Sequence, residues 1–304
     1  MKMTALFIPL LIIAAGCQGK LHKETRVLMG TFVEVISSDK AAPKIAFDEI
    51  KRIEHLLSKY DPKSEISILN STGAVKASPE TLYVMKKSAE FWKLSDGKLD
   101  PTVGPLLDLW GFTDKNFRIP APEEINRALE AVGMDKVVID EANSTIELKQ
   151  PGMRVDLGAI AKGYAVDCAV QKLRSAGIKN CLVNAGGEIY GMGTKSGNPW
   201  KVAIKNPYER GQKFIDIENK AVATSGNYEQ FFIKNDKRYC HIFDPKTGSP
   251  IETNIFSVTV VAPDCLTADA LATATFVLGN EKSYELSKNF TDVRVMIFEM
   301  GPNQ

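Results

Sequence analysis

The chain has 304 residues, of which 44% are hydrophobic and 25% charged, values that are ordinary for a soluble globular protein. This length allows one large domain or two modest ones, with a substantial buried core. The formal net charge of +1 provides no strong electrostatic field, so a nucleic-acid partner is not expected.

The N-terminal segment differs from the rest of the chain. Lys2 precedes a short apolar run at 6–15, and small residues then lead to Cys17. A basic residue, a short apolar core and small residues before a cleavage site are typical of a secretory signal. The apolar run is too short for a comfortable membrane span.

Small residues directly before Cys17 resemble the lipobox of bacterial lipoproteins, in which the cysteine carries the lipid. The alternative is a plain signal peptide with an incidental cysteine. We expect a lipoprotein signal peptide at 1–17, a polar tether at 18–25 and one domain at 26–304. The mature protein is then exported and anchored to a bacterial membrane by its lipid, with no spanning helix.

Hydrophobic periodicity and turn residues predict the secondary structure in chain order. Strands are expected at 26–37, 136–139, 145–148, 180–183, 200–204, 213–217, 221–225, 228–233, 239–243, 254–261 and 293–298. Within the first of these, Met29-Gly30-Thr31 could be a bulge or a close approach of the backbone to a ligand. Helices are expected at 42–57, from 78 through 92, at 122–132, from 158 to Gly177 and at 267–278. Helices and hairpins mix without regular βαβ alternation, which favours an α+β fold.

Residues 155–167 read VDLGAIAKGYAVD and form the first candidate site. Asp156 and a flexible turn lead into a helix whose first turns carry Lys162. A helix N-terminus has free N–H groups and partial positive charge, and a lysine adds to that charge, so this place suits a phosphate. An ordinary amphipathic helix is the alternative.

Asp269 and Thr273 form the second candidate site. They are four residues apart on a predicted helix and therefore project from the same face. One carboxylate and one hydroxyl offer only oxygen ligands, which suits Mg²⁺ rather than zinc. The alternative is that Thr267 or Asp269 caps the helix.

The third candidate is His241, on a strand that enters the turn formed by Asp244-Pro245 and Thr247-Gly248. Its ordinary pKa lies near working pH, so it could act as a general base, although a lone histidine is more often structural. An irregular loop at 97–105 either carries binding groups or is a tight connection, with Trp110 in the core.

Four further cysteines, Cys168, Cys181, Cys240 and Cys265, match no C-x-x-C signature. An exported location permits disulfides, and four cysteines allow three pairings that the sequence does not distinguish. Cys168 and Cys181 are expected to be buried free thiols.

In chain order, these segments resemble the ApbE family of flavin transferases over roughly residues 26–298. The matching residues are Met29-Gly30-Thr31; Ser58-Lys59-Tyr60 with Ser64-Glu65-Ile66; Lys98 to Pro105 with Leu109-Trp110-Gly111-Phe112; Asp156-Leu157-Gly158 with Lys162-Gly163-Tyr164; Asn184-Ala185-Gly186-Gly187; Ala223-Thr224-Ser225-Gly226; His241-Ile242 with Asp244-Pro245 and Thr247-Gly248; and Ala268 to Thr273.

The resemblance implies one α+β domain of two similar halves with antiparallel sheets and FAD between them. It implies FAD contacts from Met29, Tyr60, Lys98, Leu99, Asp100, Asp156, Lys162, His241 and Ile242. Mg²⁺ would be held by the main-chain oxygen of Ala159 with the side chains of Asp269 and Thr273. His241 is the candidate base, with Asp244 and Asp156 as competitors.

The implied reaction is Mg²⁺-dependent transfer of FMN from FAD to a threonine or serine hydroxyl of a target flavoprotein, with release of AMP. The implied acceptors are flavoprotein subunits of membrane redox complexes. One alternative is an FAD pyrophosphatase, in which water replaces the protein hydroxyl. The other is a non-catalytic lipoprotein that only binds FAD; a pair of potential metal ligands argues against it.

Overall fold

The computed structural model describes residues 20–205 and 212–300. The expected signal peptide, Cys17 and the start of the expected tether lie outside these residues. Within the described ranges, no helix is both long and apolar enough to cross a membrane.

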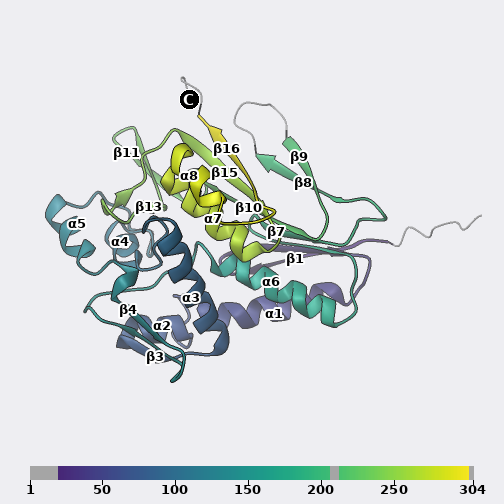
Figure 1. Ribbon diagram of the computed structural model, residues 1–304, viewed down its shortest axis with the longest axis horizontal. Coiled ribbons are helices and arrows are strands. Elements are labelled where there is room, and N and C mark those ends of the chain that lie inside the picture. Colours follow the sequence, from purple (N-terminus) through teal and green to yellow (C-terminus); the bar gives the residue numbers. More distant parts are fainter. Residues whose placement is uncertain (1–19, 206–211, 301–304) are drawn as a thin grey trace, which may run out of the picture.

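A seven-stranded sheet forms the centre of the molecule, with strand order β1-β2-β6-β7-β10-β15-β16 (Figure 1). Every neighbouring pair in it is antiparallel. Its strands are β1 His22–Leu28, β2 Thr31–Ser37, β6 Cys181–Ala185, β7 Glu188–Met192, β10 Lys220–Gly226, β15 Ile255–Ala262 and β16 Arg294–Glu299. The α+β class predicted from the sequence is confirmed.

The two faces of this sheet are covered differently. Helices α1 Ala42–Leu57, α6 Ala161–Ser175 and α7 Cys265–Leu278 pack on one face. The hairpin of β8 Trp200–Lys205 and β9 Gln212–Ile217 covers the other through a separate apolar cluster that includes Leu182 and Val261. Successive side chains of a strand point to opposite faces of the sheet, so one strand contributes apolar side chains to both faces. Leu182 belongs to the cluster beneath the hairpin, and Val183 belongs to the main core.

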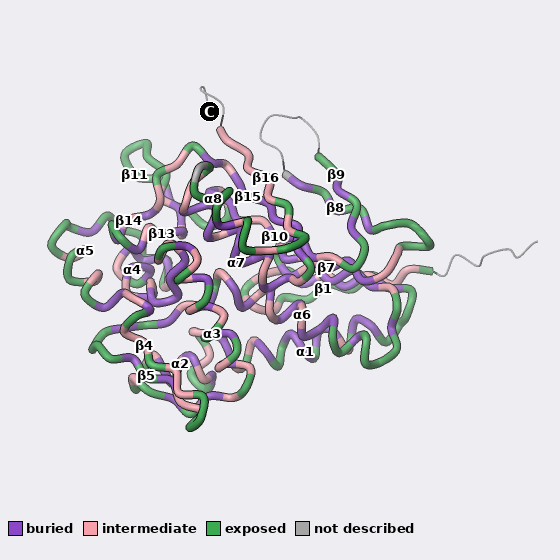
Figure 2. The backbone as a smooth tube through the Cα atoms, viewed as in Figure 1, coloured by how far each residue is buried: buried purple, intermediate pink, exposed green. Residues whose placement is uncertain are grey.

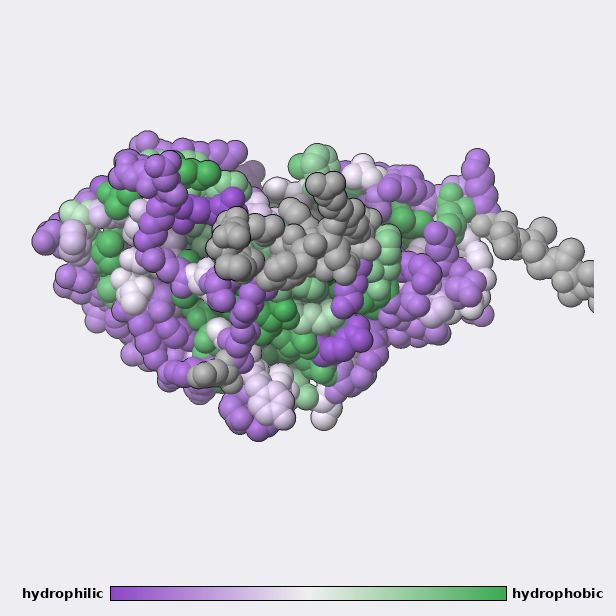
Figure 3. All heavy atoms as spheres, turned by 90° about the horizontal axis from the view of Figure 1, so that it is seen from above, coloured by the Kyte–Doolittle hydropathy of each residue, from purple (hydrophilic) through white to green (hydrophobic). Residues whose placement is uncertain are grey.

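Burial follows this layering. The tube through α7 is mostly buried, whereas α5 Pro122–Leu129 has no buried residue (Figure 2). Seen from above, hydrophobic side chains gather in the middle of the molecule and hydrophilic ones flank them (Figure 3).

A smaller lobe lies beside the main sheet. It contains the sheet β3-β5-β4, with β3 Ala74–Lys76, β4 Val137–Asp140 and β5 Thr145–Leu148. Its helices are α2 Glu65–Thr72, α3 Pro79–Leu94 and α4 Gly104–Leu109, together with α5 and the 3₁₀ turn Met134–Lys136. The remaining elements are β11 Phe231–Lys234, β12 Lys237–Cys240, β13 Phe243–Asp244, β14 Ser249–Pro250 and α8 Asn280–Ser287.

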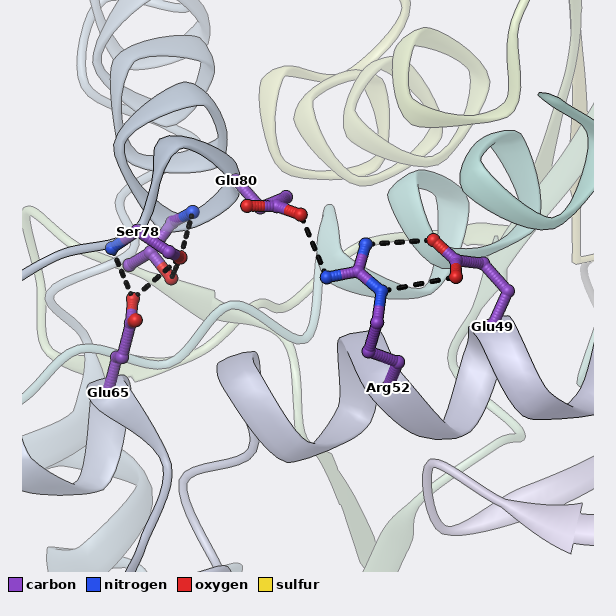
Figure 4. Close-up of polar contacts among 6 residues, drawn as sticks. Glu49, Arg52, Glu65, Ser78 and Glu80 are labelled. Carbon is purple, nitrogen blue, oxygen red and sulfur yellow. Dashed lines mark hydrogen bonds and ion pairs between the residues drawn. The ribbon is translucent and has the colours of Figure 1, made fainter. Parts of the chain in front are cut away.

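Polar contacts brace the start of α3 against α1 and α2 (Figure 4). Arg52 of α1 binds both carboxylate oxygens of Glu49 and reaches Glu80 in the first turn of α3 at 2.8 Å. Glu65 accepts hydrogen bonds from the main chain and hydroxyl of Ser78, the residue that caps α3. These contacts orient α3, whose far end leads into the loop at 97–103.

The single strand predicted at 26–37 is wrong. The segment forms the hairpin β1–β2, because Met29 and Gly30 have positive φ values of 52° and 70° and make a two-residue turn. Strand β1 begins at His22, so the paired structure starts inside the segment expected to be a tether.

The strands predicted at 228–233 and 239–243 are also shorter than expected. Strand β11 begins at Phe231, and β12 ends at Cys240. The main-chain N–H of His241 still donates to the carbonyl of Gln230 in the register of this ladder, and the chain then bends away. This break allows the following residues to line a cavity.

Two predictions about buried residues can be compared directly with the structure. Trp110 is 3% exposed and donates from its indole nitrogen to the carbonyl of Gly248, so it does belong to the core. Cys168 and Cys181 are buried free thiols, as predicted, and so are Cys240 and Cys265.

Gly111 and Gly177 provide a matched test of the turn after α4. Both have φ of 79°. A Cβ at Gly111 would lie 2.0 Å from the main-chain oxygen of Asn116, whereas a Cβ at Gly177 would meet nothing within 4 Å. We expect Gly177→Ala to cost about 1–2 kcal/mol, the strain of a left-handed L-residue, and Gly111→Ala to cost clearly more. Urea unfolding of both variants measures the difference, and equal losses would contradict the clash.

Candidate active site

A cavity of about 530 Å³ is lined by residues of the β1–β2 turn, the loop at 98–103, the starts of α6 and β7, strand β10, the segment at 229–245, and α7. Its volume is in the range of small-molecule sites. Twelve of the residues predicted from the sequence line it: Met29, Tyr60, Lys98, Leu99, Asp100, Asp156, Ala159, Lys162, His241, Ile242, Asp269 and Thr273. The structure thus brings together segments that are up to 244 residues apart, from Met29 to Thr273.

Lys162 lies between two buried carboxylates. Its ammonium forms an ion pair with Glu188 and lies 3.7 Å from Oδ1 of Asp269. Glu188 and Asp269 are each only 3% exposed. When both carboxylates are ionised, the single ammonium leaves one negative charge uncompensated among these three groups.

The pKa values of this group reflect its burial. Burial raises the pKa of Glu188 to about 7, with Asp269 adding to the rise and Lys162 opposing it. Burial also raises the pKa of Asp269, against the effect of Lys162. For Lys162, burial lowers the pKa, but the two carboxylates outweigh it and hold the pKa above its ordinary value, so the ammonium stays charged.

The donors around this group suit a hard divalent cation. Oε2 of Glu188 has no hydrogen-bond partner among the described residues, an expensive state for a buried carboxylate oxygen. Thr273 shares a hydrogen bond of 3.0 Å with Ser225, and the main chain of Ala159 borders the same cavity. Carboxylate, hydroxyl and carbonyl oxygens are ligands that Mg²⁺ prefers. No cluster of three or more His, Cys, Asp or Glu side chains suitable for a metal occurs within 20–205 and 212–300.

Asp269 is not the N-cap of its own helix, α7. The N-cap of α7 is Asp264, whose Oδ1 accepts from the main-chain N–H of Thr267. Asp269 instead accepts from the N–H of Gly163 on α6, at 3.0 Å from Oδ2. Its other oxygen, Oδ1, faces Lys162.

Lys59 and Asp156 form a second ion pair in the cavity, with 2.6 Å between Nζ and Oδ2. Burial alone lowers the pKa of Lys59, but Asp156 outweighs it, and the net change is upward. Tyr60, next in the chain, is 67% exposed, and its ring lies 5.0 Å from the Lys59 ammonium. An exposed aromatic ring at the cavity edge suits stacking on a planar ligand.

Three predicted residues, Lys98, Asp244 and Asp100, are engaged with other protein groups. The Lys98 ammonium lies 2.6 Å from Asp244 Oδ2, and Asp244 is not among the residues that line the cavity. Asp100 accepts from the main chain and hydroxyl of Thr102 and from the N–H of Met134, so its carboxylate shapes the loop.

His241 has the geometry of a neutral base. Its Nδ1 lies 3.2 Å from the carbonyl of Gln230, which assigns the proton to Nδ1 and leaves Nε2 as an acceptor. Burial lowers the pKa of His241 to about 4, with a smaller lowering from Lys162. The ring is therefore uncharged at neutral pH.

Several cavity residues were not identified from the sequence: Lys59, Glu188, Ser225, Glu229 and Gln230. Lys59 and Ser225 lie inside segments used for the family resemblance, and Glu188 directly follows one. Burial raises the pKa of Glu229 to about 7, with Lys162 opposing and Asp269 adding to the rise. Nothing in the local sequence distinguishes Glu229 from a surface glutamate.

Comparison with known proteins identifies relatives over most of the chain. The ApbE family matches residues 29–297. A protein of Haemophilus influenzae named FAD:protein FMN transferase is 35% identical over 301 residues, covering 90% of this chain and 86% of the relative. One of the same name from Vibrio cholerae is 37% identical over 248 residues, covering 79% and 74%.

Solved structures agree with these matches. The ApbE protein of Thermotoga maritima has a TM-score of 0.84 at 35% identity, covering 91% of this chain and 94% of its own. The flavin transferase ApbE of Vibrio cholerae has a TM-score of 0.83 at 32% identity, covering 93% and 95%.

The ionisation of His241 can be tested directly, since the sequence has three histidines. We expect the imidazole of His241 to titrate near pH 4 rather than near its ordinary 6.5. Because the folded pKa is the lower one, the unfolded chain binds more protons between these values. The contribution of His241 to stability is therefore complete above pH 6.5 and is lost as the pH falls toward 4.

NMR titration of ¹³C-labelled histidines measures this midpoint, with His241→Gln assigning the resonance. A midpoint near 6.5 for His241 would show that its ring is solvated.

Proposed function

The chain belongs to the ApbE family of flavin transferases and is an enzyme, and we propose that it transfers FMN from FAD to a threonine or serine hydroxyl of an acceptor flavoprotein, releasing AMP. The observation that carries the proposal is the buried group of Lys162, Glu188 and Asp269 in a cavity lined by the predicted FAD contacts.

In this reaction the acceptor hydroxyl oxygen forms a bond to the phosphorus of the FMN half of FAD. The P–O bond to the adenylate half breaks, and AMP leaves with the bridging oxygen. The hydroxyl proton must be removed, and the charge that accumulates on the departing phosphate must be neutralised.

We assign the second task to Lys162 and to a Mg²⁺ ion held by Asp269, Thr273 and the main-chain oxygen of Ala159. When bound, such an ion neutralises phosphate charge and orients the pyrophosphate. Lys162 supplies a fixed positive charge on the same side of the cavity, since it lies 3.7 Å from Asp269. Asp156 and Lys59 lie along the cavity wall and bind the remainder of FAD, with Met29, Tyr60, Leu99 and Ile242.

His241 is the proposed base, because it lines the cavity with Nε2 free to accept. Asp244 is better placed to hold Lys98, to which its carboxylate is already paired at 2.6 Å. We propose that the ion pair of Lys98 with Asp244, together with the loop that contains Asp100, positions FAD and takes no part in the proton transfer or the bond cleavage.

We also propose that the protein is exported and held to a membrane by a lipid on Cys17. The support is the lipobox-like sequence, together with the start of β1 at His22, only five residues further on. A lipid anchor at Cys17 would hold the domain close to the proposed acceptors, subunits of membrane redox complexes.

An FAD pyrophosphatase uses the same residues with water as the acceptor. The test is incubation with FAD, Mg²⁺ and a threonine-containing acceptor peptide, followed by mass spectrometry. We expect FMN added to the peptide and AMP in equal amount, both lost with a chelator. Free FMN with unmodified peptide would indicate hydrolysis, and intact FAD under all conditions would overturn the proposal. Asp269→Ala should abolish both products by removing a metal ligand, and Asp264→Ala, at the N-cap of the same helix, is the matched control.

His241→Ala tests the base. We expect it to keep FAD binding, measured by flavin fluorescence, and to slow transfer by roughly 10²–10⁴-fold, the usual scale for a general base. Unchanged turnover at neutral pH would exclude His241 from the proton transfer.

A further inference from the structure

Helices α6 and α7 cap each other. Gly163, the third residue of α6, donates its N–H to Oδ2 of Asp269 on α7. Cys265 and Leu266, the first two residues of α7, donate their N–H groups to Oδ1 and Oδ2 of Asp167 on α6, each at 2.8 Å. Each helix thus places a carboxylate on the N-terminal N–H groups of the other, and each carboxylate lies four residues beyond the donor Gly163 or Cys265.

These contacts satisfy N-terminal N–H groups that the helices' own capping positions leave free. The first N–H groups of a helix have no partner within it and carry partial positive charge, so a carboxylate there is stabilising. The residue before α6, Ile160, makes no side-chain cap. In α7, Asp264 satisfies only Thr267, which leaves the first two N–H groups to Asp167.

The two helices also approach closely at this point. A Cβ on Gly163 would lie 2.3 Å from the carbonyl oxygen of Cys265 and 2.9 Å from Cβ of Asp269. With backbone against backbone, the two carboxylates fix both the separation and the register of the helices.

We propose that Asp167 is a positioning residue for the phosphate and metal end of the site. By holding the start of α7 on α6, it keeps Asp269 and Thr273 opposite Lys162 and the main chain of Ala159. This inference rests on the proposed metal-dependent function, because it concerns the same ligands.

The test is the affinity for the metal alone. Asp167→Asn keeps the size of the side chain but replaces one acceptor oxygen by a donor NH₂, which cannot accept from the second N–H. We expect the Kd for Mn²⁺, measured by EPR on the protein without FAD, to rise about 10–100-fold, the usual effect of removing a group that orients a metal ligand.

Asp264→Ala is the matched control, since it weakens the N-terminus of α7 without touching α6. It should lower the unfolding midpoint and leave the Kd for Mn²⁺ unchanged. Gly163→Ala is a second variant, in which a methyl group separates the helices while both carboxylates remain, and it should weaken Mn²⁺ binding too. Circular dichroism shows which variants are folded.

Asp167→Asn with wild-type affinity, or Asp264→Ala weakened equally, would overturn the positioning role while leaving the proposed function standing. Wild-type protein that binds no Mn²⁺ and transfers FMN without metal would instead remove the metal from the proposed function, and this inference with it.

Discussion

The arrangement of the protein depends on one buried electrostatic balance. Glu188 and Asp269 are almost fully buried, and the ammonium of Lys162 is their shared counter-charge. Burying a carboxylate without a partner is costly, so the two carboxylates can be buried only where the ammonium of Lys162 lies against them. They come from β7, α7 and α6, and the packing of two helices on the sheet is therefore inseparable from the charge balance of the cavity.

The parts of this balance that depend on local spacing could be predicted from the sequence. Asp269 and Thr273 share a helix face because they are four residues apart, and Lys162 lies in the first turn of α6. Glu188 could not be found in that way, because its role depends on β7 pairing between β6 and β10. Asp167 was likewise missed, since its partners, Cys265 and Leu266, are about a hundred residues away in the chain.

The errors in the fold prediction have a common cause, which is local backbone geometry that departs from the hydrophobic pattern. Met29 adopts a positive φ without being Gly, Asn or Asp, so the sequence indicates a bulge or a close approach to a ligand at Met29-Gly30-Thr31 and not a hairpin turn. Its N–H donates to Glu54 at 2.6 Å, a tertiary contact that holds the turn against the end of α1. At His241 the backbone bends directly after its hydrogen bond to Gln230, which ends a strand that the apolar pattern continues.

The charge balance also bears on how substrate and metal bind. When Glu188 and Asp269 are both ionised, this part of the cavity wall carries one uncompensated negative charge and repels a pyrophosphate, because Lys162 is already paired to both carboxylates. A divalent cation held by Asp269, as proposed, would reverse the sign of this wall and make phosphate binding favourable. Phosphate oxygens are ligands with which Mg²⁺ commonly completes a coordination shell that has few protein oxygens. If the ion binds as proposed, each of the two ligands raises the affinity for the other by the same factor. A protein that only stored flavin would have little use for such coupling, whereas the proposed transfer reaction would use the metal at the pyrophosphate that it cleaves.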